Sequence, residues 1–112
     1  MLNHMVEQHA HLDAVFHALA DPTRRAVLHS VASGEASTAT ELAARLPVSR
    51  QAVAKHLALL ERARLVDAQR AGREVRFQAT PGPLGEAIEW MESVGTQWDE
   101  RLAALARAVD KP

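Results

Sequence analysis

Four polar residues, Ser49, Arg50, Gln51 and Lys55, lie close together at the start of an expected helix. Apolar residues recur every third or fourth position on the other side of that helix. Arg and Gln side chains can hydrogen-bond the edges of guanine and adenine, whereas Ser and Lys are common contacts to DNA phosphates. The spacing therefore predicts a helix with hydrogen-bond donors on its exposed side, as reading the DNA major groove requires.

A shorter helix is expected just before this one, so that residues 38–63 form a helix-turn-helix. Thr38 begins the shorter helix, and Glu41 follows three residues later, which is the spacing of a capping box. Pro47 ends it, and Ser49 caps the next helix. The apolar residues of the second helix are Val53, Leu57 and Leu60.

The pattern after Leu65 changes to strict alternation of apolar and polar residues, which is typical of β-strands. Gly72 lies in the middle of the expected turn, where it supplies backbone freedom. We therefore expect a β-hairpin, or wing, over residues 65–80. Its basic residues are Arg70 and Arg73 near the tip and Arg76 on the returning strand.

The two ends of the chain are expected to be helical, over about 9–20 and 83–108. Between the first helix and the helix-turn-helix, Asp21 and Pro22 begin a further helix that runs to about Ala32. The first helix carries an apolar face at Leu12, Val15, Phe16 and Leu19. The last helix carries apolar or small residues at alternating spacings of four and three, which is the pattern of a packed helix pair: Leu84, Ile88, Met91, Gly95, Trp98, Leu102, Leu105 and Val109.

A chain this small cannot easily bury both apolar faces within itself, so we expect them to form a homodimer interface. The expected interface residues are Leu12, Val15, Phe16, Leu19, Ile88, Met91, Trp98, Leu102 and Leu105. The alternative is that both helices pack on the body of their own chain.

The composition predicts one mostly helical domain over residues 1–112, with 47% hydrophobic residues. The chain has no cysteine, which excludes disulfides, thiolate metal sites and cysteine nucleophiles and fits a cytoplasmic location. We also expect no membrane span and no signal peptide. The net charge is -1, but basic residues outnumber acidic ones in the central segment 45–76, where the expected reading helix lies. A local basic surface is what phosphate contact requires.

Three segments together resemble the ArsR/SmtB family of winged helix-turn-helix transcriptional regulators. They are ALADPTRRAVL (18–28), TELAARLPVSRQAVAKHLALLERARLV (40–66) and AGREVRFQAT (71–80). The resemblance implies a mostly α fold with a hairpin wing, a dimer built from the first and last helices, and repression from a palindromic operator. It assigns DNA contact to Ser49, Arg50, Gln51, Lys55, His56, Arg70, Gly72, Arg73 and Arg76. For His56 a half-buried, hydrogen-bonded position is the alternative.

Metal-sensing members of that family often carry cysteines before the reading helix, but residues 40–46 contain none, and the last helix has no histidine. The chain thus resembles the branch without a cysteine metal motif, and we expect no cofactor. The alternative function is a nickel or zinc sensor that uses His4, His9 and His11, with His17 within two helical turns of His11. An unknown small-molecule or metal effector stays open.

The sequence argues against two further classes of protein. An enzyme is not expected, because the sequence has no Gly-rich phosphate loop, no His-Glu-x-x-His motif and no nucleophile beside a base. A protein-interaction module would not need the positive central segment. DNA binding should weaken steeply as salt rises, and a protein contact need not.

Overall fold

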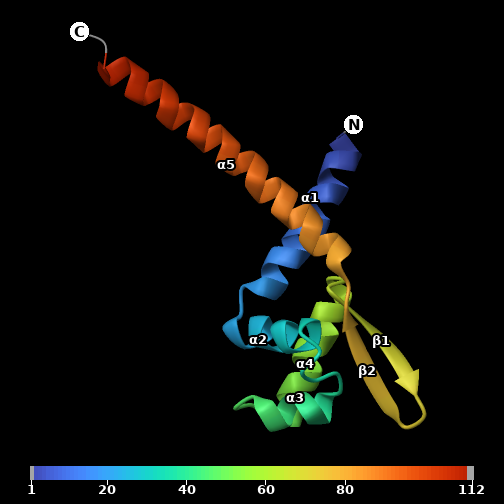
Figure 1. Cartoon of the computed structure of the whole chain (residues 1–112). Coiled ribbons are helices and arrows are strands. Elements are labelled where there is room, and N and C mark those ends of the chain that lie inside the picture. Colours follow the sequence, from blue (N-terminus) through green and yellow to red (C-terminus); the bar gives the residue numbers. More distant parts are fainter. Residues whose placement is uncertain (1, 111–112) are drawn as a thin grey trace.

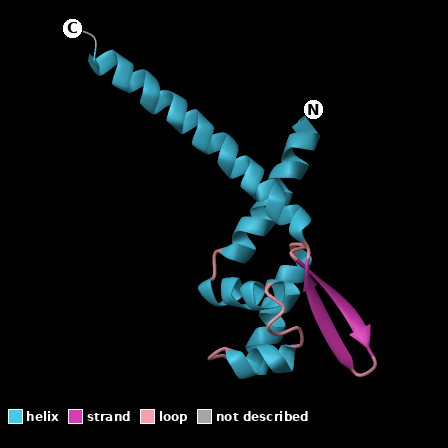
Figure 2. Cartoon of the chain, in the orientation of Figure 1, coloured by secondary structure: helices cyan, strands magenta, loops and turns pink. Residues whose placement is uncertain are grey.

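The structure, a computed structural model, describes the backbone of residues 2–110 and the side chains of residues 11–109. Over that range the chain forms five helices and one two-stranded antiparallel sheet (Figures 1 and 2). The elements are α1 (Leu2–Leu19), α2 (Pro22–Ala32), α3 (Ala39–Arg45), α4 (Arg50–Arg62), β1 (Val66–Ala71), β2 (Glu74–Ala79) and α5 (Pro81–Asp110). In this described part no helix has the length and apolar character needed to cross a membrane.

The hydrophobic core lies where α1, α2, α3 and α4 meet the start of the wing and the base of α5. Its largest fully buried side chains are Val15, Val27, Leu42, Val53, Leu57, Leu60 and Leu65. Each helix of the body contributes one apolar side, as the helical spacing predicted. Because all the helices share one core, α4 is held in a fixed orientation and presents its other side to solvent.

The ends of α1 and α5 differ from the prediction. α1 begins at Leu2 rather than near residue 9, because the polar residues before the apolar stripe include good helix formers. α5 begins at Pro81 rather than at residue 83. Both Pro81 and Pro83 fit into its first turn, where the N–H that proline lacks would have no helical partner. The Thr80 N–H donates to the Leu65 carbonyl oxygen (2.9 Å), which joins this start to the end of α4.

The ends of α2 and α4 follow one hydrogen-bond scheme. Gly34 after α2 and Arg64 after α4 both adopt positive φ, of 77° and 62°. The following N–H reaches back to a carbonyl five residues earlier, and after α4 this bond runs from Leu65 to Leu60 (3.0 Å). This is the Schellman arrangement, in which glycine is the usual residue at positive φ. Arginine at that position carries backbone strain, which the burial of Leu65 offsets.

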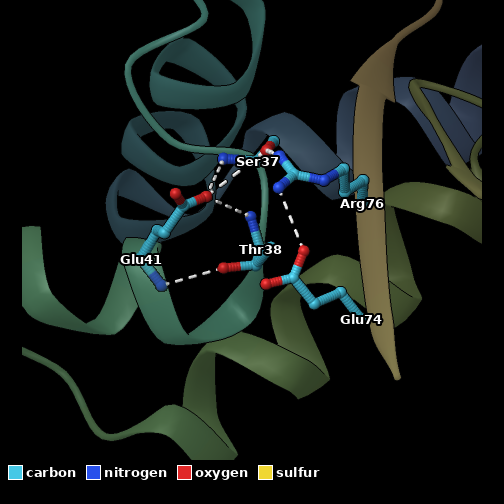
Figure 3. A network of polar contacts seen from close by, with 5 residues as sticks. All are labelled: Ser37, Thr38, Glu41, Glu74 and Arg76. Carbon is cyan, nitrogen blue, oxygen red and sulfur yellow. Dashed lines mark hydrogen bonds and ion pairs between the residues drawn. The ribbon is translucent and has the colours of Figure 1, made fainter. Parts of the chain in front are cut away.

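Polar contacts at the start of α3 also hold the wing (Figure 3). Thr38 and Glu41 form the predicted capping box, with the Thr38 N–H donating to Glu41 Oε1 (3.0 Å) and the Glu41 N–H donating to Thr38 Oγ1 (3.1 Å). Ser37 connects this cap to β2, because its carbonyl accepts from the Phe77 N–H (2.8 Å) and its hydroxyl accepts from Arg76 Nη1 (3.0 Å). The base of the wing therefore moves with α3.

The outer part of α5 extends far from the body (Figure 1). The Cα radius of gyration is 18.9 Å, and the longest dimension is 71 Å. A compact chain of this length would have a radius of gyration of about 13 Å. Ala87 is buried near the base of α5, but the exposed fraction of the apolar stripe rises from 44% at Ile88 to 75% at Val109.

The first testable prediction concerns Glu41. Hydrogen bonds from the backbone N–H groups of Ser37 and then Thr38 hold the pKa of this carboxyl below its ordinary value. A lowered folded-state pKa stabilises the fold above the unfolded-state pKa of about 4.3, and this stabilisation is lost as the pH falls through the folded-state value. Glu41→Gln should therefore lower the urea midpoint of unfolding at pH 7. The difference in midpoint between the wild type and the variant should become smaller by about pH 3. A difference in midpoint that stays constant between pH 7 and about pH 3 would contradict the prediction.

Candidate nucleic-acid interface

The N-terminal half of α4 presents the residues that the sequence predicted as DNA contacts. Ser49 is the N-cap, and its Oγ accepts from the Ala52 N–H (3.1 Å). The Ser49 hydroxyl proton remains available to donate to a ligand such as a phosphate oxygen. Arg50, Gln51 and Lys55 are all exposed. Gln51 and Lys55 are four residues apart and share one helix face, whereas Arg50 projects from the first turn, about 140° around the helix from Lys55.

The opposite side of α4 fixes this orientation. Val53 and Leu60 are completely buried, and Leu57 is almost so. α3 packs against this helix and buries Leu42 beside it. A rotation of α4 about its axis would bring the charged side into the core, at a cost of several kcal/mol per unpaired charge. The burial of the apolar side of α4 therefore determines which of its residues face solvent.

His56 does not share the exposed surface of Arg50, Gln51 and Lys55. Its side chain is only 20% exposed. It lies beside the start of α2, where Nδ1 is 3.3 Å from Arg24 Nη1 and Nε2 is 3.9 Å from Asp21 Oδ2. The half-buried alternative from the sequence therefore describes His56 better than direct DNA contact, because its ring nitrogens already face protein partners.

The wing has the expected geometry at its tip. β1 and β2 pair in register from Val66 with Ala79 to Ala71 with Glu74. Gly72 has φ 67°. A residue with a Cβ would be strained at this positive φ, so the turn favours glycine. Arg70 and Arg73 are exposed.

Arg76 differs from the other two wing arginines. Its guanidinium donates to Ser37 Oγ and to Glu74 Oε2, both at 3.0 Å (Figure 3). The predicted role of Arg76 as a DNA contact thus competes with a role inside the protein. Arg70 and Arg73 are exposed as well, and they are the other candidate cations of the wing.

An open hollow of about 540 Å³ separates α4 from the wing. Arg50 lines it from the helix and Arg73 lines it from the wing, with Thr38 and Thr40 at the start of α3 between them. Glu41 and Glu74 also line the hollow, so its charged residues are two arginines and two glutamates. Two arginines on opposite sides of an open hollow could both reach a phosphate-bearing strand.

The expected dimer residues fall into two groups. Ile88, Met91, Trp98, Leu102 and Leu105 are exposed along α5. Leu12, Phe16 and Leu19 are partly buried against the core of their own chain, and the Phe16 ring packs edge-on against Trp90 at 5.5 Å between centroids. Val15 is completely buried, so its assignment to an intermolecular surface was wrong. Helical spacing shows that Val15 is on an apolar face, but not which neighbour covers that face.

The histidines of the alternative metal site are only partly within the described side chains. His4 and His9 lie outside them. His11 Nε2 is 3.1 Å from Glu86 Oε2 of α5, so its described partner is a single carboxylate. Among the described residues no group of three or more His, Cys, Asp or Glu side chains could hold a metal ion.

Some residues of this region were not assigned to the site from the sequence. Thr38 and Thr40 line the hollow, and Ser37 fixes the base of the wing. Asp21 and Arg24 support α4 through His56. The D-P-T-R-R segment was visible in the sequence, but only the capping role of its aspartate could be inferred locally. Asp21 does cap α2, since Oδ2 accepts from the Arg24 N–H (2.8 Å).

Known proteins resemble this chain in both sequence and structure. Residues 19–69 match the family described as helix-turn-helix domain. The HTH-type transcriptional regulator Rv2034 of Mycobacterium tuberculosis is 38% identical over 98 residues, which cover 88% of each chain. The transcriptional repressor SdpR of Bacillus subtilis is 30% identical over 91 residues, which cover 81% of this chain and 100% of SdpR.

A solved structure supports the same relationship. An ArsR-like transcriptional regulator from Rhodococcus sp. RHA1 superposes with a TM-score of 0.77 at 41% identity, covering 93% of this chain and 97% of its own. This match confirms the winged helix-turn-helix fold that the sequence predicted. With its exposed donors on α4, its arginine-bearing wing and relatives that it matches over most of their length, the chain belongs to the ArsR-like helix-turn-helix transcriptional regulators, which are DNA-binding proteins and not enzymes.

Proposed function

We propose that this protein is a homodimeric repressor that binds a palindromic DNA operator. The observation that carries the proposal is the exposed set of Arg50, Gln51 and Lys55 on α4, with Arg50 across an open hollow from Arg73 of the wing. The similarity to a relative named as a transcriptional repressor supports the direction of regulation. A repressor of this kind acts where the chromosome is, which for a bacterium is the cytoplasm.

In the proposed complex, α4 enters the major groove with its N-terminal end toward the bases. Arg50 and Gln51 read base edges, because they project from the first turn and can form bidentate hydrogen bonds with guanine and adenine. Lys55 and Ser49 bind phosphates. Arg70 and Arg73 reach the neighbouring minor groove or its backbone, where a narrow groove attracts arginine. The hollow between α4 and the wing then accommodates the intervening DNA strand.

The proposed dimer forms through α5, with the exposed parts of α1 at its edge. Apolar residues that alternate at spacings of four and three along a projecting helix match a second copy of the same helix. Leaving Trp98, Leu102 and Leu105 more than half exposed would be costly for an isolated chain. A two-fold axis through this pair would place the two reading helices on successive major grooves, about 34–36 Å apart.

The second prediction compares two residues of α4 on an operator selected from random DNA. Arg50→Ala should weaken specific binding by on the order of 1–3 kcal/mol and relax the preference at one base position. Lys55→Ala should weaken binding to all sequences similarly and reduce the slope of log affinity against log salt by about one. Fluorescence anisotropy at several salt concentrations measures both effects.

Arg107→Ala is the matched control, because it removes the same charge from the far end of α5. It should leave affinity and base preference unchanged. If Arg50→Ala and Lys55→Ala both bind the operator like the wild type, α4 is not the reader. If the complex is insensitive to salt, the partner of this surface is not DNA.

The third prediction tests the dimer. Leu102 is 57% exposed in the middle of the stripe, and Leu102→Glu would place two like charges in the proposed interface. Sedimentation equilibrium should show a dimer for the wild type and a monomer for this variant, with a matching loss of operator affinity. Ala104→Glu adds the same charge off the stripe and should remain dimeric. Equal behaviour of the two variants would refute this interface.

A further inference from the structure

Arg24 forms a polar junction between three helices. Its Nε donates to the Ala18 carbonyl oxygen (2.7 Å) and its Nη2 donates to the His17 carbonyl oxygen (3.3 Å), both at the C-terminal end of α1. Its Nη1 is 3.3 Å from His56 Nδ1 on α4. Each nitrogen of one rigid, planar guanidinium is thus used on a different partner, so the group fixes the position of those partners relative to one another.

His56 completes the junction from the side of α4. Because a guanidinium can only donate, the contact with Arg24 requires that His56 Nδ1 accept and that Nε2 carry the proton. Nε2 faces Asp21 Oδ2 at 3.9 Å, and the same Oδ2 accepts from the Arg24 N–H. Asp21, Arg24 and His56 therefore lie together at this junction, where the His56 side chain is mostly buried and the Asp21 side chain is 37% exposed.

The neighbouring arginine provides a natural comparison. Arg25 Nη1 donates to the Leu19 carbonyl oxygen (2.7 Å), so it also caps the C-terminal end of α1. Among the described residues, the hydrogen bond of its guanidinium goes to α1, and none goes to α4. The two arginines thus share one function, stabilising the last carbonyls of α1. Only Arg24 adds a connection to the reading helix.

We propose that Arg24 is a positioning residue that fixes the angle between α1 and α4 and thereby sets the half-site spacing that the dimer accepts. This inference rests on the proposed homodimer, in which the α1–α5 side of the molecule lies at the two-fold axis. The core holds α1 and α4 together through apolar contacts, which are non-directional. The Arg24–His56 contact adds a directional restraint on their angle.

A small angular change is enough to matter. A helix of 13 residues such as α4 is about 20 Å long. A tilt of about 10° therefore moves its far end by about 3.4 Å, which is the rise of one base pair. Losing one restraint between α1 and α4 can thus shift or blur the register of the two reading helices on DNA.

The fourth prediction uses the selected operator together with versions that have one base pair inserted or deleted at the centre. The wild type should bind the original spacing about tenfold or more tightly than the altered ones. Arg24→Gln should reduce this ratio to about threefold or less, or move the preferred spacing by one base pair. Arg25→Gln should keep the wild-type ratio. The ratio is independent of overall stability, so a purely structural role of Arg24 would not change it.

Two variants of His56 keep the test decisive if Arg24→Gln does not fold. His56→Leu removes the acceptor and should lower the spacing ratio as Arg24→Gln does. His56→Asn offers Oδ1 at a similar position and should restore the ratio at least in part. If Arg24→Gln, His56→Leu and Arg25→Gln all keep the wild-type ratio, the positioning role is refuted while the dimeric reader stands. If the wild type shows no spacing preference, the dimeric reader itself fails, and this inference fails with it.

Discussion

The burial of Val53, Leu57 and Leu60 along one side of α4 is the constraint on which the rest of the structure depends. Each of these side chains contributes roughly 1.5–3 kcal/mol when it leaves water. Together they prevent α4 from rotating, so the polar residues of the same helix have to face outward. The apolar sides of α1, α2 and α3 supply the other walls of this core. In the proposed complex, DNA recognition uses the side of α4 that folding leaves exposed.

α5 differs from α4 because most of its apolar stripe is exposed. Its base is anchored by Ala87 in the core and by the Thr80 contacts to the end of α4. Beyond that base, the large apolar side chains of its stripe are 44–75% exposed, and the helix extends away from the body (Figure 1). In the proposed dimer the two tasks are separate, because the compact body contacts DNA and the projecting helix contacts the second copy.

Local chemistry made much of the fold predictable from the sequence. Asp21, Thr38 and Ser49 each accept from an N–H group three residues away, and Gly72 lies in its own turn, so each could be identified without a three-dimensional neighbour. Helical periodicity likewise located the exposed side of α4. The contacts that could not be predicted join distant segments. Examples are Arg24 with His56, Arg76 with Ser37, and the complete burial of Val15. A polar residue gives no local signal for a partner more than thirty residues away.

The way in which the wing is held has a mechanical consequence. The Phe77–Ser37 backbone bond and the Arg76–Ser37 contact clamp β2 near its C-terminal end. From Phe77 to the turn at Gly72 the hairpin runs on for about 16 Å, at the usual rise of a strand. A two-stranded ribbon clamped at its base and free at its tip behaves as a cantilever. In the proposed complex, a bend at the tip would follow grooves of different width without breaking the Ser37 contacts at the base, and operators could then differ in shape outside the bases that α4 contacts.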